Sequence, residues 1–190
     1  MSKSESPLEI SPEALHAAVH RELFKDERLL VYAVLDGAAI PGLLDHLYAV
    51  PGPEFVCLYR GELNPDLAEC APYLVQLQPD TAFTDWLLAE GWGKHWGVFA
   101  TASESLKTMR KHFRTFLMVK DPAGQQLYFR YYDPRVLRIY LPTCNAQELG
   151  LVCGPVQAYL LEDETPTNLL RFTRTAGVLR RESIRLSAAR

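Results

Sequence analysis

The 190-residue sequence lacks the features that most directly assign a protein to a class. No apolar run approaches the length of a membrane-spanning helix, and the N-terminal residues contain no apolar signal core, so we expect a cytoplasmic protein without membrane contact. A net charge of −3 gives no overall attraction to nucleic acid or to an anionic membrane. The hydrophobic fraction of 48% and the charged fraction of 23% are ordinary, so the composition favours a folded globular domain.

Metal, cofactor and nucleotide motifs are missing as well. The four cysteines form no C-x-x-C pair and have no histidine at ligand spacing, which argues against a zinc site and favours reduced thiols with structural roles. The sequence contains no P-loop, G-x-S-x-G or H-E-x-x-H pattern. Gly91, Gly93 and Gly97 lie between a helix pattern and a strand pattern, the reverse of the order that dinucleotide binding requires. The acidic run 162–164 indicates a solvated boundary. We therefore predict no cofactor and no metal.

The sequence does contain alternating helix and strand patterns, which are typical of an α/β layer fold. We expect a single domain at 29–164 with a mixed, mostly central sheet covered by helices, and helical extensions at both ends. In the N-terminal extension (1–28), residues 1–10 are expected to be disordered, and Ser11 and Pro12 begin a helix. The apolar run 29–35 predicts a central strand covered on both faces. Further strands are expected at 54–59, 73–77, 95–100, 117–120, 126–132 and 156–161, with helices at 40–49, 65–70, 82–88, 103–116 and after Asp133.

The strongest functional lead is a strand, a sharp corner and a helix within residues 127–145. Asp133 and Pro134 are a favoured helix start, because Asp accepts the free N–H groups of the first turn and Pro has no N–H to leave unpaired. Arg130 precedes this corner and Arg135 follows it. Two guanidiniums beside a capping carboxylate are unusual enough to single out this corner.

Two interpretations of the corner remain open. In one, the arginines are solvated or paired with nearby acids and have no further role. In the other, Arg130, Arg135 and Arg138 form a surface with Tyr132 for binding another protein, since interfaces favour arginine and aromatic side chains. Asp36, at the end of the central strand, is a candidate to orient one of these arginines through a charge-assisted pair, which would make that arginine architectural.

The C-terminal segment, residues 165–190, differs in composition from the rest of the chain. Residues 166–190 contain six arginines and one glutamate, a net charge of +5. Apolar residues at helical spacing predict a basic helical tail that is either solvated or a docking arm for an acidic partner surface. The candidate partner contacts in this tail are Arg171, Arg174, Arg180 and Arg181.

Two other classes of function stay open on the residues alone. One is a hydrolase with a Cys-His or carboxylate site, for example Cys57 with a histidine distant in sequence, although an apolar sequence context predicts that this cysteine is buried. The other is a nucleic-acid-binding module that uses the arginine-rich tail. We consider nucleic acid an unlikely partner and place both alternatives below a protein-binding role.

The order of several segments resembles the type VI secretion adaptor family, whose small domain has been catalogued as a domain of unknown function. The resemblance covers residues 29–162, is most specific at FRYYDPRV (129–136), and is supported by the strand end at Asp36 and by 96–119. It implies an accessory protein, not an enzyme, that binds a toxic effector protein in the bacterial cytosol and promotes its loading onto the VgrG spike protein. The positions implied as the family signature, without a catalytic role, are Asp36, Arg130, Asp133, Pro134 and Arg135.

Overall fold

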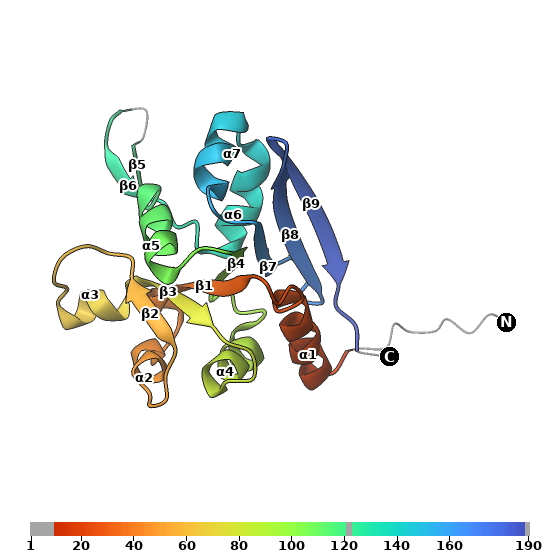
Figure 1. Cartoon of the computed structure of the whole chain (residues 1–190). Coiled ribbons are helices and arrows are strands. Elements are labelled where there is room, and N and C mark those ends of the chain that lie inside the picture. The colour runs from red at the N-terminus through yellow and green to blue at the C-terminus, as the bar shows by residue number, and fades with distance from the viewer. Residues whose placement is uncertain (1–9, 121–122, 189–190) are drawn as a thin grey trace.

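A seven-stranded sheet runs through the computed structural model, which describes residues 10–120 and 123–188 (Figure 1). In spatial order the strands are β2 (Glu54–Cys57), β3 (Pro72–Leu77), β1 (Leu30–Asp36), β4 (Gly97–Ala102), β7 (Ala158–Glu162), β8 (Asn168–Thr175) and β9 (Val178–Arg185). A separate ribbon pairs β5 (Met118–Lys120) with β6 (Gln126–Tyr128). The expected single α/β domain is confirmed. The sheet is not mixed as expected, because all of its described strand pairs are antiparallel.

Helices cover both faces of the sheet (Figure 1). The helices are α1 (Pro12–Leu23), α2 (Leu43–Leu47), α3 (Pro65–Glu69), α4 (Ala82–Gly91), α5 (Leu106–Thr115), α6 (Pro134–Tyr140) and α7 (Ala146–Cys153), with short 3₁₀ helices η1 (Gly37–Ala39) and η2 (Leu141–Thr143). One hydrophobic core joins the sheet to α5, α6 and α7, and a second joins it to α1, α2 and α4. Among the described residues, no helix is both long enough and apolar enough to cross a membrane.

Strand β1 shows why the sheet can be covered on both faces. Tyr32 and Val34 point into the first core, and Ala33 and Leu35 point into the second. Successive side chains of a strand alternate between faces, so an apolar run without interruption supplies both cores. The prediction of a central strand covered on both sides is therefore confirmed.

The C-terminal segment is a β-hairpin and not the expected helix. In β8, Leu169 faces the second core while Leu170 and Phe172 face the first. Thr175 pairs with Val178 across a two-residue turn in which Ala176 and Gly177 both have positive φ, as tight hairpin turns require. The apolar residues therefore alternate with the period of a strand, and hairpin pairing extends the sheet where we predicted a separate tail.

The remaining differences are local. Helix α1 is confirmed, with the Ser11 hydroxyl accepting the Ala14 N–H at 3.2 Å. Of the segment 1–10 that we expected to be disordered, residues 1–9 lie outside the described residues. The hairpin expected at 117–132 is confirmed as the β5–β6 ribbon, although its second strand ends at Tyr128, and residues 121–122 lie outside the described part. Helix α7 was not predicted; it begins with an Asn145–Glu148 capping box.

Candidate functional site

Three adjacent strands meet at one end of the sheet and bring acidic residues close together. Because β1, β4 and β7 are antiparallel neighbours, the end of β1 at Asp36, the start of β4 and the end of β7 at Glu162 share this end. The Asp36 backbone N–H donates to the Trp96 carbonyl at 2.9 Å, which ties β1 to the residue before β4. We call this place the sheet end.

The corner at residues 129–133 is joined to the sheet end through Arg130. The Arg130 Nη2 donates to Asp36 Oδ2 in an ion pair, and Asp36 Oδ1 accepts the Ala38 N–H at 3.2 Å. The Asp36 side chain is only 3% exposed, whereas the Arg130 side chain is 52% exposed. This hydrogen bond raises the pKa of Arg130 above its ordinary value. Asp36 therefore orients an arginine, as the sequence suggested.

Asp133 caps α6 and also holds the second arginine. Its Oδ1 accepts the Arg135 N–H at 2.9 Å, which confirms the predicted cap, with the buried Pro134 at the first helical position. The Arg135 guanidinium donates from Nε to Oδ1 at 3.0 Å and from Nη2 to Oδ2 at 2.7 Å, a fork that matches the carboxylate. Burial raises the pKa of Asp133, but the bonds from Arg135 outweigh it and leave this pKa below its ordinary value. The Arg135 side chain remains 56% exposed.

A third pair joins His95 to Glu162. The His95 Nδ1 lies 2.7 Å from Glu162 Oε2, and the His95 backbone N–H donates to the same carboxylate at 3.3 Å. Burial raises the pKa of Glu162, and the neighbouring His95 opposes this shift. The expectation that residues 162–164 are a solvated boundary is wrong for Glu162, which is buried. No pattern in the sequence connected it to His95, because the two meet only through strand pairing.

The other predicted contact residues are distributed over the molecule. Tyr132 is 3% exposed and packs in the first core, so its position does not support the surface role expected for it. Arg138 is largely buried, with its Nη2 3.7 Å from Glu164 Oε1. Arg171 donates to Glu22 at 2.9 Å and lies 3.4 Å from Glu182, so it ties α1 to the β8–β9 hairpin.

Three further arginines of the hairpin are exposed. The Arg181 Nη2 lies 4.0 Å from Asp163 Oδ1. Arg174 and Arg180 form no ion pair within the described part of the chain. The partner contacts expected for these three residues stay a prediction.

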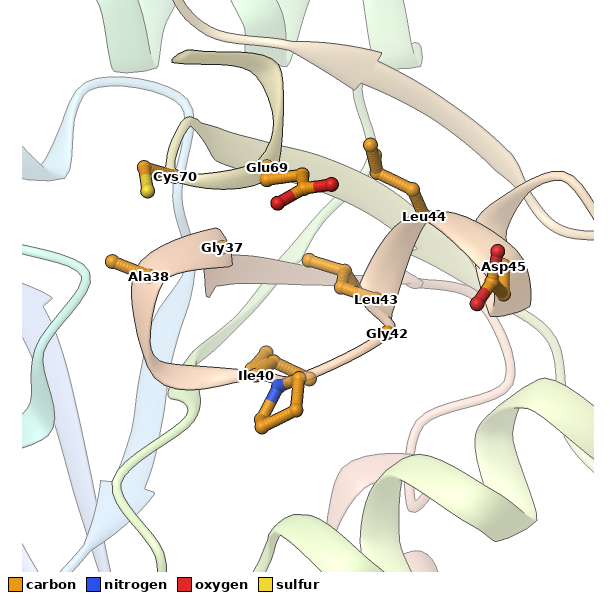
Figure 2. Close-up of a pocket in the computed structure, with 10 residues that line it drawn as sticks. Gly37, Ala38, Ile40, Gly42, Leu43, Leu44, Asp45, Glu69 and Cys70 are labelled. Atoms are coloured by element: carbon orange, nitrogen blue, oxygen red, sulfur yellow. The ribbon is translucent and has the colours of Figure 1, made fainter. Parts of the chain in front are cut away.

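A pocket of about 310 Å³ lies next to the sheet end (Figure 2). Residues of η1, α2 and the end of α3 line it, with the carboxyl groups of Asp45 and Glu69 on different helices. A Cβ at Gly37 would lie 2.5 Å from the carbonyl oxygens of Glu69 and Ala71, so only glycine allows this close packing. The lining contains neither histidine nor arginine, and the ion pairs lie outside it.

The cysteine considered as a nucleophile has an unfavourable environment. Burial raises the pKa of the Cys57 thiol, which lowers the fraction of reactive thiolate. Across residues 10–120 and 123–188, no group of three or more histidine, cysteine or acidic side chains lies close enough together to hold a metal ion. What the sheet end offers instead is two half-exposed guanidiniums, each fixed by a buried carboxylate.

A comparison with protein families matches residues 31–151 to the family described as Domain of unknown function (DUF4123). The chain belongs to this family. The DUF4123 match contains Asp36, His95 and the whole 129–136 motif, but it ends before Glu162 and the β8–β9 hairpin. Searches among curated proteins and among solved structures found no match to this chain.

Proposed function

We propose that this DUF4123 protein is a type VI secretion adaptor, or effector chaperone, which binds a toxic effector in the cytoplasm and promotes its loading onto the VgrG spike. The family match and the resemblance of FRYYDPRV at 129–136 support this role. The observation that carries the proposal is the environment of Arg130 and Arg135, the two arginines of the family signature. Each is fixed by a buried carboxylate, yet each keeps about half of its side chain exposed.

This arrangement suits protein binding better than bond breaking. The carboxylates of Asp36 and Asp133 are already occupied by arginines, so neither is placed to act as a general base. The outward-facing parts of the guanidiniums remain open to donate hydrogen bonds to carboxylates or carbonyls of a partner. Partly exposed charges of this kind contribute more to specificity and association rate than to affinity. Moderate affinity is what a loader needs, because it must release its client.

The two arginines have different roles in this proposal. Arg130 bridges the corner to the end of β1, 94 residues away in the sequence, so it holds the surface together. Arg135 pairs with a residue only two positions away and therefore contributes less to the fold. We propose Arg135 as the main contact at the sheet end, with Arg174, Arg180 and Arg181 of the hairpin as contacts for a second protein.

The test is co-purification of the tagged chain from cells that express the neighbouring secretion genes. We expect the effector and VgrG to be recovered with the wild-type chain, and recovery of neither would contradict the proposal. An Arg135→Gln variant should lose one of the two proteins while keeping the wild-type circular dichroism spectrum. The matched control is Arg28→Gln, because Arg28 also pairs with an aspartate two residues away, Asp26, but lies before β1 and distant in sequence from the corner.

A further inference from the structure

A groove of about 410 Å³ lies between the β5–β6 ribbon and the segment that connects β2 to α3. In Figure 1 the ribbon projects from the body of the molecule near α5, with α3 also at this side. Leu67 on α3 is 44% exposed and Tyr128 on the ribbon is 58% exposed, and both line the groove together with Leu63 and Met118. Large apolar side chains are therefore in contact with solvent on both walls.

The ribbon itself is unusually apolar for an exposed element. Met118 pairs with Tyr128 on one face, which lines the groove, and Val119 pairs with Leu127 on the other. All four side chains are exposed. Two short strands without a covering layer are only marginally stable in water, and a contiguous exposed apolar patch commonly marks an interaction site. These properties are typical of an element whose apolar side chains become covered when a partner binds.

The basic side chains at this groove lack acidic partners. Arg60 and Arg114 line the groove, and α5, the helix that carries Arg114, also carries Lys107, Arg110 and Lys111. No carboxylate of residues 10–120 or 123–188 lies within ion-pair distance of any of these five side chains. Arg110 Nε is buried and has no hydrogen-bond partner in that part of the chain. Burial lowers the pKa of Arg114, and the positive charges of Arg110 and Arg60 lower it further.

Arg114 fixes the position of one of these charges. Its Nε donates to the Leu58 carbonyl at 2.9 Å, and its Nη2 donates to the carbonyls of Cys57 and Tyr59. These bonds attach α5 to the end of β2. The helix that carries the basic residues is therefore joined directly to the segment 57–59 beside the groove. The Arg114 charge is therefore fixed in the lining of the groove.

We propose that this groove binds an acidic amphipathic segment of a partner protein, with apolar side chains between Leu67 and Tyr128 and carboxylates on Arg60 and Arg110. The inference rests on the proposed adaptor function, because it gives the chemistry by which one of the two secretion partners is held. A nucleic acid fits less well, because Leu63, Leu67 and Met118 in the walls have no charge or hydrogen-bond donor that could bind a sugar–phosphate backbone. The combination of apolar walls with uncompensated arginines matches carboxylates and apolar side chains on one peptide.

The test uses the full chain and a defined probe. The probe is a fluorescent 16-residue peptide with leucine or phenylalanine at positions i, i+3, i+4 and i+7 and glutamate at the flanking positions. A second peptide has the same apolar positions with lysine in place of every glutamate. We expect the glutamate peptide to bind at least tenfold more tightly by fluorescence anisotropy, with an affinity that falls as salt rises. Equal binding of the two peptides, or no binding, overturns the proposal.

Matched variants then locate the site. Leu67→Asp and the double variant Arg60→Ala/Arg110→Ala should each weaken binding of the glutamate peptide at least tenfold. Leu151→Asp, at an exposed leucine on α7, and Arg185→Ala, at an exposed arginine on β9, should leave it unchanged. Equal losses in test and control variants would overturn the assignment of the site.

Other occupants give distinguishable results. A concentration-dependent dimer in sedimentation that is lost in Leu67→Asp would show that a second copy covers the groove and would overturn the proposal. Tighter binding of a 16-nucleotide single strand than of the peptide would also overturn it. Failure here is separate from failure of the adaptor role: if Leu67→Asp still co-purifies with both secretion proteins, the groove is not the site, but the function stands.

Discussion

The molecule has two arginine-bearing surfaces that differ in whether the arginines have acidic partners. At the sheet end, Arg130 and Arg135 each pair with a buried carboxylate, and the surface is close to neutral. Beside the groove, Arg60, Arg110 and Arg114 have no acidic partner in the described chain and lie against exposed apolar side chains. The same residue type therefore stabilises the fold at one surface and leaves charge available at the other.

The difference shows what determines the role of an arginine in this protein. A guanidinium that neutralises a buried carboxylate cannot be removed without leaving that carboxylate unpaired, which is costly in a low-dielectric interior. A guanidinium near other cations and without an acidic partner, such as that of Arg60, contributes little to folding, and its removal relieves repulsion between like charges. Substitution of Arg130 at the sheet end should therefore affect stability most, whereas substitution of Arg135 or of Arg60 at the groove should affect binding more than stability.

The largest expected effect comes from Arg130→Ala. Its loss leaves the carboxylate of Asp36 buried without its ion pair, so we expect the free energy of unfolding to fall by about 3 kcal/mol. Urea unfolding monitored by circular dichroism measures this. Arg60→Ala should change it by no more than about 0.5 kcal/mol. The double variant Asp36→Asn/Arg130→Gln should recover most of the loss, and a double variant as unstable as Arg130→Ala would contradict the pairing.

Glycine-to-alanine substitutions should also have different effects on stability at the two surfaces. Gly37→Ala should cost about 2 kcal/mol, because the new Cβ would lie 2.5 Å from two backbone carbonyls that cannot move independently. Gly61→Ala, in the loop at the groove, meets no atom within 4 Å, and only its φ of +82° opposes the change. We expect a loss of about 1 kcal/mol there. Thermal unfolding of both variants tests the ranking, which equal losses would refute.

The stability of the protein should depend on pH through His112 on α5. Burial lowers the pKa of His112 to about 4, and its Nε2 lies 3.0 Å from the Val152 carbonyl. The unfolded chain takes up this proton near its ordinary pKa of 6.5 and the folded chain only near 4, so stability should fall as the pH decreases through this window. We expect a loss of about 1–2 kcal/mol after allowing for partial exposure. In His112→Gln, unfolding curves at pH 7 and pH 4.5 should differ by correspondingly less.

Of the two paired arginines at the sheet end, Arg135 should have the smaller effect on stability. Asp133 keeps its bond from the backbone N–H of residue 135 in an Arg135→Ala variant, so we expect a loss of only about 1 kcal/mol at neutral pH. The pKa of Asp133 is lowered in the folded state, so its contribution is present above 3.8 and is lost as the pH falls below that value. The stabilities of wild type and variant should therefore converge in strong acid. A constant difference down to pH 2 would contradict the role assigned to this pair.

The local signals in the sequence predicted the site better than the overall topology. Asp133 and Pro134 specify a helix start by their own chemistry. The uninterrupted apolar run of β1 implies a strand that is covered on both faces. Both predictions are confirmed because each depends on neighbours in the sequence. A charge-assisted pair between Asp36 and one of the arginines was one of the two alternatives that the sequence left open, and the structure contains it.

The errors have a common physical cause. The direction of the strands and the conversion of the predicted helical tail into β8 and β9 depend on pairing between distant segments. Leu169, Leu170 and Phe172 fit a helical stripe nearly as well as a strand until β7 is available beside them. Glu162 and His95 meet only after β7 has paired with β4, so no spacing in the sequence records their contact. Likewise, the groove is formed by segments on either side of α5.

The most direct test of the central claim is secretion of the effector by cells that lack this protein. If the chain loads the effector onto VgrG, its deletion should abolish export of the effector while VgrG is still exported. Re-expression of the wild type should restore effector export, and folded Leu67→Asp should not. Export of the effector at the wild-type level in the deletion strain would contradict the account.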